Sequence, residues 1–196
     1  IGEIGLDFYW DSSFSKDQYV AFERQIDLAL QYDLPIVIHS RNSIDECIQT
    51  VKRKQNSNLR GVFHCFSGTA VQANQIIDLG FYLGIGGVVT FKNSGLDKVM
   101  EKVELNHVVL ETDAPYLAPV PFRGKRNESS YIKYVLSKLS ELYGISEEQL
   151  AKLTTENSKN TIKIEAINRS DYPISLKSVS INLFNSIESK IYAQTY

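Results

Sequence analysis

The 196-residue sequence has few cysteines and no long hydrophobic run. No stretch approaches the ~20 apolar residues that a membrane-spanning helix needs, so we expect no membrane partner. The two cysteines, Cys47 and Cys65, are too few for the disulfide framework of a small secreted domain. These absences favour a cytoplasmic protein.

An excess of charge of one sign is also missing, because 21 Lys and Arg face 23 Asp and Glu, for a net charge of −2. This balance argues against a general nucleic-acid coat protein but permits a local basic patch. The 11 glycines and 5 prolines follow no period, which excludes a collagen-like chain, and 43% hydrophobic residues are ordinary for a globular protein. No feature of the sequence indicates an obligate protein partner.

Short apolar runs alternate with amphipathic helical patterns about five times along the chain. The runs are continuously apolar, which is typical of parallel strands covered by helices, so we predict an α/β fold. The predicted strands lie at 1–6, 34–38, 61–63, 81–89 and 108–110. Helices are predicted over 16–33, 70–79 and 147–160, from Ser43 with an apolar stripe to Val51, and along a stripe from Tyr131 to Leu142 that Gly144 closes. Ser43 with Glu46, and Ser146 with Gln149, predict capping boxes for two of these helices.

Four potential metal ligands fall where predicted strands stop: Glu3, His39, His64 and Asp113. In a parallel βα barrel the carboxyl ends of all strands meet on one face, where active sites lie. Two imidazoles and two carboxylates that converge there would suit Zn²⁺, Mn²⁺ or a similar ion. Each residue alone has a simpler structural explanation, as a cap, a core residue or a turn former, and the prediction depends on their conjunction. The third histidine, His107, precedes its strand, so we expect it at the opposite rim with a structural role.

A loop after Asp113 carries three cations within four residues: Arg123, Lys125 and Arg126. The simplest interpretation is a solvated loop. Beside a metal site, however, fixed cations would suit a phosphate-bearing substrate, and Arg41 could join them or pair with a local acid. We therefore predict these four residues as phosphate-binding.

Several other motifs favour structural roles. Ser67 lacks the Gly-x-Ser-x-Gly context of a hydrolase nucleophile, and Cys65 should point away from His64 if the strand pleat continues. The glycines at 84, 86 and 87 lack the dinucleotide-binding fingerprint and indicate close backbone approach instead. The aromatic run 8–10 could stack on a base or sugar, although packing in the core or a loop explains it at least as well.

Together the motifs resemble the TatD family of metal-dependent hydrolases, also called TatD-type deoxyribonucleases. The resemblance covers residues 1 to about 160. It is carried by five stretches in the family's order: Gly2–Asp7 (GEIGLD), Pro35–Arg41 (PIVIHSR), His64–Gly68 (HCFSG), Glu111–Pro115 (ETDAP) and Arg123–Glu128 (RGKRNE).

The resemblance implies a TIM-like (β/α) barrel with a site for two divalent ions, Mg²⁺, Mn²⁺ or Zn²⁺. By that analogy Glu3 is the bridging carboxylate, His39 and His64 bind the second ion, and Asp113 binds the first and handles the proton of the water. Glu3 and Asp113 are then the catalytic residues, and the implied reaction is hydrolysis of a phosphodiester in DNA or another nucleic acid. Arg123, Lys125 and Arg126 would meet the nucleic-acid backbone.

The family opens with a strand that carries a His-x-His pair, and the 196 residues begin at Ile1, beyond that strand. We therefore expect an incomplete barrel over residues 1–162, a fragment that is weakly active or inactive by itself. Residues 163–196 do not resemble the family, and we expect an atypical tail that packs poorly.

Two other functions remain open. The same fold could hydrolyse another bond, such as the ester of a D-aminoacyl-tRNA or a small cyclic amide. The chain could also be a non-catalytic remnant that binds nucleic acid.

Overall fold

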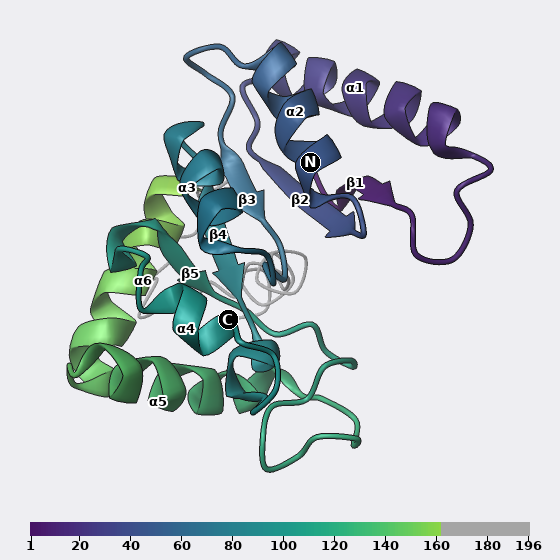
Figure 1. Cartoon of the computed structure of the whole chain (residues 1–196). Coiled ribbons are helices and arrows are strands. Elements are labelled where there is room, and N and C mark those ends of the chain that lie inside the picture. Colours follow the sequence, from purple (N-terminus) through teal and green to yellow (C-terminus); the bar gives the residue numbers. More distant parts are fainter. Residues whose placement is uncertain (162–196) are drawn as a thin grey trace, which may run out of the picture.

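The computed structural model describes residues 1–161, which form a parallel five-stranded sheet with helices between its strands (Figure 1). The strands pair in sequence order, each with the next along the chain, which is the order of a βα barrel. They are β1 (Ile4–Asp7), β2 (Ile36–Arg41), β3 (Gly61–Phe63), β4 (Tyr82–Ile85) and β5 (Val108–Leu110). The predicted α/β class with parallel strands is confirmed, whereas the predicted tail 163–196 lies outside the described residues.

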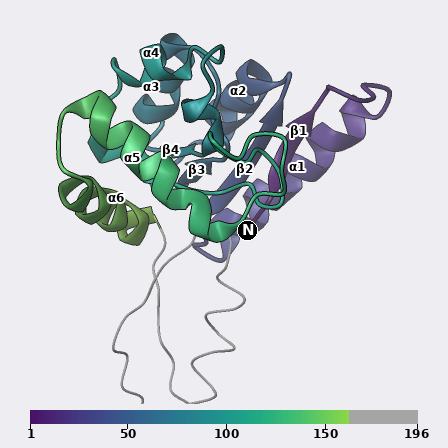
Figure 2. The same cartoon turned by 90° about the horizontal axis from the view of Figure 1, so that it is seen from below.

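Within residues 1–161, six α-helices and three short 3₁₀ helices connect the strands and follow β5. The α-helices are α1 (Ser15–Gln31), α2 (Ile44–Lys54), α3 (Ala70–Asp78), α4 (Leu96–Met100), α5 (Ile132–Tyr143) and α6 (Glu147–Thr161). The 3₁₀ helices are η1 (Gly87–Thr90), η2 (Leu105–His107) and η3 (Ser129–Tyr131). Figure 2 shows the helices arranged around the outside of the strands. No helix of residues 1–161 combines the length and the apolar character needed to cross a bilayer.

The two faces of the sheet have different roles because side chains alternate along each strand. One face packs against the helices in a continuous core that includes Ile36, Ile38, Phe63, Leu83 and Phe22. The other face carries a small apolar layer that consists of the buried residues Val62 and Val109 with the partly buried Val37 and Tyr82. This inner layer forms the floor on which the polar residues of the site stand.

Two predicted helix starts have different outcomes. Ser146 and Gln149 bond reciprocally at 3.0 and 3.2 Å, which confirms that capping box. The box predicted at Ser43 and Glu46 is wrong, because the buried Ser43 hydroxyl donates to the carbonyl of Leu6 at 2.5 Å. Ser43 thereby connects the start of α2 to β1 across the core.

The predicted strand 81–89 is also shorter in the structure, because the backbone turns into η1 at Gly87. A Cβ on Gly87 would lie 2.2 Å from the carbonyl oxygen of Leu117. Only glycine lets the loop that follows Asp113 approach this closely.

Tyr143, in the last turn of α5, joins that helix to the segment after α4. Its hydroxyl donates to the carbonyl oxygens of Met100 at 2.6 Å and Val103 at 2.9 Å. Burial raises the pKa of Tyr143 to about 12, above the ~10 of an unfolded tyrosine. The neutral phenol therefore stabilises the fold fully below pH ~10, and this contribution is lost as the pH rises through about 12.

We expect Tyr143→Phe to lower the free energy of unfolding by about 1–2 kcal/mol at neutral pH, since both hydrogen bonds disappear. Urea titrations would measure this loss, with the exposed Tyr32→Phe as an unchanged control. Between pH 10 and 12 the wild type should lose more stability than Tyr143→Phe. Parallel loss in both proteins would contradict the role of the Tyr143 hydroxyl.

Candidate metal centre

The polar residues of the site follow the inner apolar layer along three strands. His39, His64 and Glu111 come two residues after Val37, Val62 and Val109 respectively, so the pleat directs them to the same face. Parallel pairing then brings the carboxyl ends of β2, β3 and β5 together at one rim.

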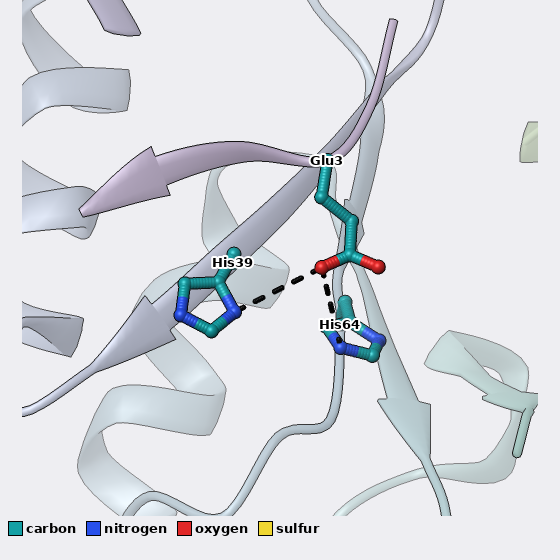
Figure 3. A group of neighbouring side chains, drawn as sticks. All are labelled: Glu3, His39 and His64. Carbon is teal, nitrogen blue, oxygen red and sulfur yellow. Dashed lines mark ion pairs between the residues drawn. The ribbon is translucent and has the colours of Figure 1, made fainter. Parts of the chain in front are cut away.

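Glu3, His39 and His64 form a cluster whose ligand atoms all lie within 4.8 Å of one another (Figure 3). Glu3 Oε2 lies 3.9 Å from His39 Nδ1 and 3.8 Å from His64 Nε2. Glu3 therefore faces both imidazoles with a single oxygen atom.

The position of Glu3 in the chain differs from the prediction that it ends a strand. It immediately precedes β1, which begins at Ile4. The close approach of β1 to β2 brings the carboxylate to the rim nevertheless, because Gly5 has no Cβ, and a Cβ there would lie 2.0 Å from the carbonyl oxygen of His39.

Asp113 also lies beside the cluster, as predicted. Its Oδ1 is 3.5 Å from His64 Nε2. Burial is the largest influence on Asp113 and, with the nearby Glu3, raises the pKa of its carboxyl although His64 opposes the shift. Asp113 is therefore a stronger base than an ordinary aspartate, placed on the Glu3 side of His64.

The other nitrogen of His64 contacts Glu111, a residue whose role the sequence analysis missed. His64 Nδ1 lies 3.0 Å from Glu111 Oε1, and the same oxygen accepts the backbone N–H of Cys65 at 2.7 Å. Glu111 is fully buried, and Gly84 makes room for it, since a Cβ at Gly84 would lie 2.1 Å from Glu111 Oε2. The sequence did contain a signal for this role. Glu111 lies two residues after Val109 and two residues before Asp113, a spacing that puts the side chains of Val109, Glu111 and Asp113 on one face.

The pKa of His64 reflects these neighbours. Burial by itself would lower the pKa of this imidazole, but Glu111, Glu3 and Asp113 outweigh it and raise the pKa. Three carboxylates around one buried histidine are an electrostatic arrangement that favours a positive charge at this place.

Asp7, at the end of β1, is a second missed residue. Its Oδ2 lies 3.0 Å from His39 Nε2, and its Oδ1 accepts the N–H of Tyr9 at 2.9 Å. Partial burial would raise the pKa of Asp7, but these contacts with Tyr9 and His39 lower it. Gln18 on α1 holds the Asp7 backbone through both its N–H and its carbonyl oxygen. Both histidines of the cluster thus have a carboxylate on the ring nitrogen that faces away from Glu3.

Cys65 lies on the same side as His64, contrary to the prediction. Its sulfur atom belongs to a group with His64 and Glu111 whose ligand atoms lie within 4.8 Å of one another. The strand pleat does not continue, because β3 ends at Phe63 and Cys65 has a positive φ of 48°. Burial and the nearby carboxylates raise the pKa of this thiol, so it is a neutral neighbour of the cluster and no nucleophile.

The donor set fits a divalent metal ion. Two imidazole nitrogens and one carboxylate oxygen are ligands that Zn²⁺ and Mn²⁺ accept. The carboxylates that orient the outer nitrogens of the imidazoles are typical partners of metal-binding histidines. Glu3, His39 and His64 would hold the ion, with Asp113 at its edge.

The four predicted phosphate-binding cations lie outside this cluster. Among residues 1–161, none of them forms an ion pair with a carboxylate of the cluster. Arg41 stacks on Tyr9, with Cζ 3.6 Å from the ring centroid, and Arg123 lies 4.3 Å from the ring of Phe91. Lys125 and Arg126 are exposed.

The loop that carries Arg123, Lys125 and Arg126 is nevertheless fastened to the loop after Asp113. The buried Asn127 donates from Nδ2 to the carbonyl of Tyr116 at 2.7 Å, and its N–H donates to Pro115 at 3.0 Å. This holds the cations on the side of the sheet where Asp113 lies. His107, by contrast, precedes β5 at the other end of the sheet, as predicted.

The comparison with known proteins agrees with this geometry. The model of the family "TatD related DNase" matches residues 1–163. The chain belongs to the TatD family. Bacillus subtilis YabD, an uncharacterized metal-dependent hydrolase, is 42% identical over 165 residues, which cover 84% of this chain and 65% of YabD. The uncharacterized metal-dependent hydrolase YcfH of Escherichia coli K12 is 34% identical over 85% of this chain and 63% of YcfH.

Solved structures of TatD proteins share the fold. The structure of YjjV, a TatD homologue of Escherichia coli K12, is 32% identical and has a TM-score of 0.79 over 84% of this chain and 63% of YjjV. A TatD family hydrolase of Entamoeba histolytica is 25% identical with a TM-score of 0.71. This likeness confirms the predicted TIM-like barrel type of fold. The chain spans slightly less than two thirds of the length of these TatD relatives.

We expect His64→Asn to weaken Mn²⁺ and Zn²⁺ binding at least about 10–100-fold, because even the outer partners of metal ligands contribute that much. Isothermal titration, or the rise in melting temperature on metal addition, would measure it. His107→Asn is the matched control at the opposite end of the sheet and should bind as the wild type does. Equal affinities in His64→Asn and wild type would remove this cluster as the metal site.

Proposed function

We propose that this TatD chain is a hydrolase that uses two divalent ions to cleave phosphodiester bonds of DNA or another nucleic acid. The observation that supports it best is the convergence of Glu3, His39, His64 and Asp113 at one rim, with Glu3 Oε2 between the two imidazoles. Ions bound there would activate water and stabilise the charge that develops on a phosphate.

The position of each residue in the cluster indicates a different role in the proposed reaction. Glu3, which faces both histidines with one oxygen, is the candidate for the shared, bridging ligand. His39 and His64 are held by Asp7 and Glu111, so their inner nitrogens are oriented before any ion arrives. Asp113, whose Oδ1 lies 3.5 Å from His64 Nε2, is the candidate to accept the proton of the attacking water at its carboxylate.

The exposed loop cations support a polyanionic substrate. Arg123, Lys125 and Arg126 have no carboxylate partner among residues 1–161, so they are available to phosphates. Asn127 ties their loop to Tyr116 and Pro115, in the segment that follows Asp113. Contacts of these cations with phosphates would bind the nucleic-acid backbone with little sequence preference.

Glu3→Gln should lower metal-dependent cleavage of labelled single-stranded DNA by about 100-fold or more, since the amide removes the charge that faces both imidazoles. The assay should use the 196-residue chain and a version extended upstream, with Mg²⁺, Mn²⁺ or Zn²⁺. Glu104→Gln, an exposed acid before η2, is the control and should keep full activity.

Parallel assays with RNA and D-aminoacyl-tRNA separate the nuclease from the ester hydrolase. If only the aminoacyl ester is cleaved, the bond that this protein hydrolyses is that ester and not a phosphodiester. Metal binding without hydrolysis of any substrate, in either version of the protein, would leave a non-catalytic nucleic-acid-binding role.

Replacing Lys125 by Gln should reduce the slope of log affinity against log salt by ~0.7, the value for one phosphate contact on a single strand. Arg123→Gln and Arg126→Gln should each act similarly. Lys52→Gln, an exposed cation in the last turn of α2, should leave the slope unchanged. Fluorescence anisotropy of a labelled oligonucleotide over a range of salt concentrations measures these slopes. Unchanged slopes in all three loop variants would exclude the loop from binding.

A further inference from the structure

An exposed group of one cation and two aromatic rings stands beside the metal cluster. The rings of Tyr9 and Trp10 meet edge to face, with centroids 4.8 Å apart. The guanidinium of Arg41 lies over the Tyr9 ring at 3.6 Å and within 5.5 Å of the Trp10 ring. We call these three residues the aromatic platform.

The platform is not part of the hydrophobic core. Trp10 is 79% exposed and Tyr9 49% exposed, whereas the neighbouring Phe8 packs against the core. Large exposed aromatic surfaces are costly in water, and in recognition sites they bind other planar groups. Packing in the core, one structural explanation offered by the sequence, therefore holds for Phe8, whereas Tyr9 and Trp10 pack only on each other and on Arg41.

The platform is joined to the metal cluster through a single side chain. Asp7 accepts the N–H of Tyr9 with one carboxylate oxygen and contacts His39 Nε2 with the other. The backbone of Arg41 is fixed as well, since its carbonyl accepts the N–H of Phe8 at 2.9 Å and its N–H donates to Ser43 Oγ at 3.1 Å. A group that rests on the platform is thus placed at a defined position relative to His39.

Arg41 has no direct ion pair. Within residues 1–161 its guanidinium forms no salt bridge and no hydrogen bond; it lies against the two rings and interacts electrostatically with Asp7. It also lines a groove together with Lys98 and Lys102, and Asp45 and Glu46 line the same groove. A cation stacked on a ring keeps its donors free for a phosphate.

We propose that the aromatic platform binds an unpaired nucleobase of a single-stranded nucleic acid, with Arg41 on the adjacent phosphate. The inference rests on the proposed function and names its substrate as unpaired rather than duplex. Stacking on an aromatic ring requires a base whose face is open, and it is tolerant of sequence because every base has such a face. The same chemistry serves DNA and RNA.

Trp10 is the one tryptophan of the chain, so its fluorescence reports on the platform directly. The full chain, without added metal so that nothing is cleaved, is titrated with oligothymidylate, oligouridylate and an abasic oligomer of equal length. Both base-bearing strands should quench the tryptophan and bind about tenfold tighter than the abasic strand. A stronger response to one of the two identifies DNA or RNA as the source of the base.

Variants measured by anisotropy of labelled strands complete the test. Trp10→Ala should lower the affinity for oligothymidylate about tenfold and leave that for the abasic strand unchanged. Tyr32→Ala, which removes an aromatic ring that is 62% exposed at the end of α1, should change neither. Equal quenching by the abasic strand, or an equal loss on both strands in Trp10→Ala, would overturn the platform.

The result separates this inference from the proposed function. Metal-dependent cleavage of the abasic strand without any preference for bases would keep the hydrolase and reject the platform. A clear base preference without cleavage would keep the platform and reject the hydrolase.

Discussion

The contact between His64 and the buried carboxylate of Glu111 determines much of the arrangement at the rim. An imidazole with one nitrogen 3.0 Å from a fully buried acid has little freedom to rotate, so its other nitrogen faces Glu3 and Asp113. The acid is accommodated only because Gly84 has no side chain. A carboxylate buried to this extent is stabilised by the N–H of Cys65 and by His64 together, and losing either partner would leave a costly unpaired charge.

The sheet separates stability from chemistry through the alternation of its side chains. Residues that point outward form one continuous core with the helices. Residues that point inward begin as the small layer of Val37, Val62, Tyr82 and Val109 and continue, one step later, as ligands and their partners. The same periodicity that packs Ile38 and Phe63 into the core therefore directs His39 and His64 to the opposite face, at the rim. Substitutions in the two sets should consequently affect different properties, since the cavity left in the core and the lost ligand at the rim lie on opposite faces.

Much of the fold and of the metal cluster could be predicted from the sequence, because apolar runs show where strands lie. The same runs do not show which way a residue at a strand end points, and the wrong predictions come from there. His39, His64 and Asp113 follow apolar runs, and parallel strands bring such positions together, so their convergence was predictable. Glu111 and Asp7 were missed because their role depends on the face to which a strand-end residue points, and a run of strand residues does not show where the pleat stops. Cys65 was placed wrongly for the same reason, since a positive φ after Phe63 breaks the alternation. Ser43 bonds Leu6, a residue far away in sequence, and no local pattern distinguishes that partner from a helix cap.

Because of Asn157 on α6, assembly of the metal-binding cluster depends on the order in which the chain is synthesised. Its side-chain amide donates to the carbonyl oxygens of Leu105 and Val108, both at 2.7 Å, and so holds the start of β5. That strand carries Glu111 and leads to Asp113, whereas Glu3, His39 and His64 come from the first third of the chain. A growing chain therefore completes its histidine ligands early and must wait for α6 before the strand that orients His64 is secured. Until α6 has formed, the buried Glu111 has no fixed position. The metal-binding rim is therefore completed late, although Glu3, His39 and His64 are synthesised first.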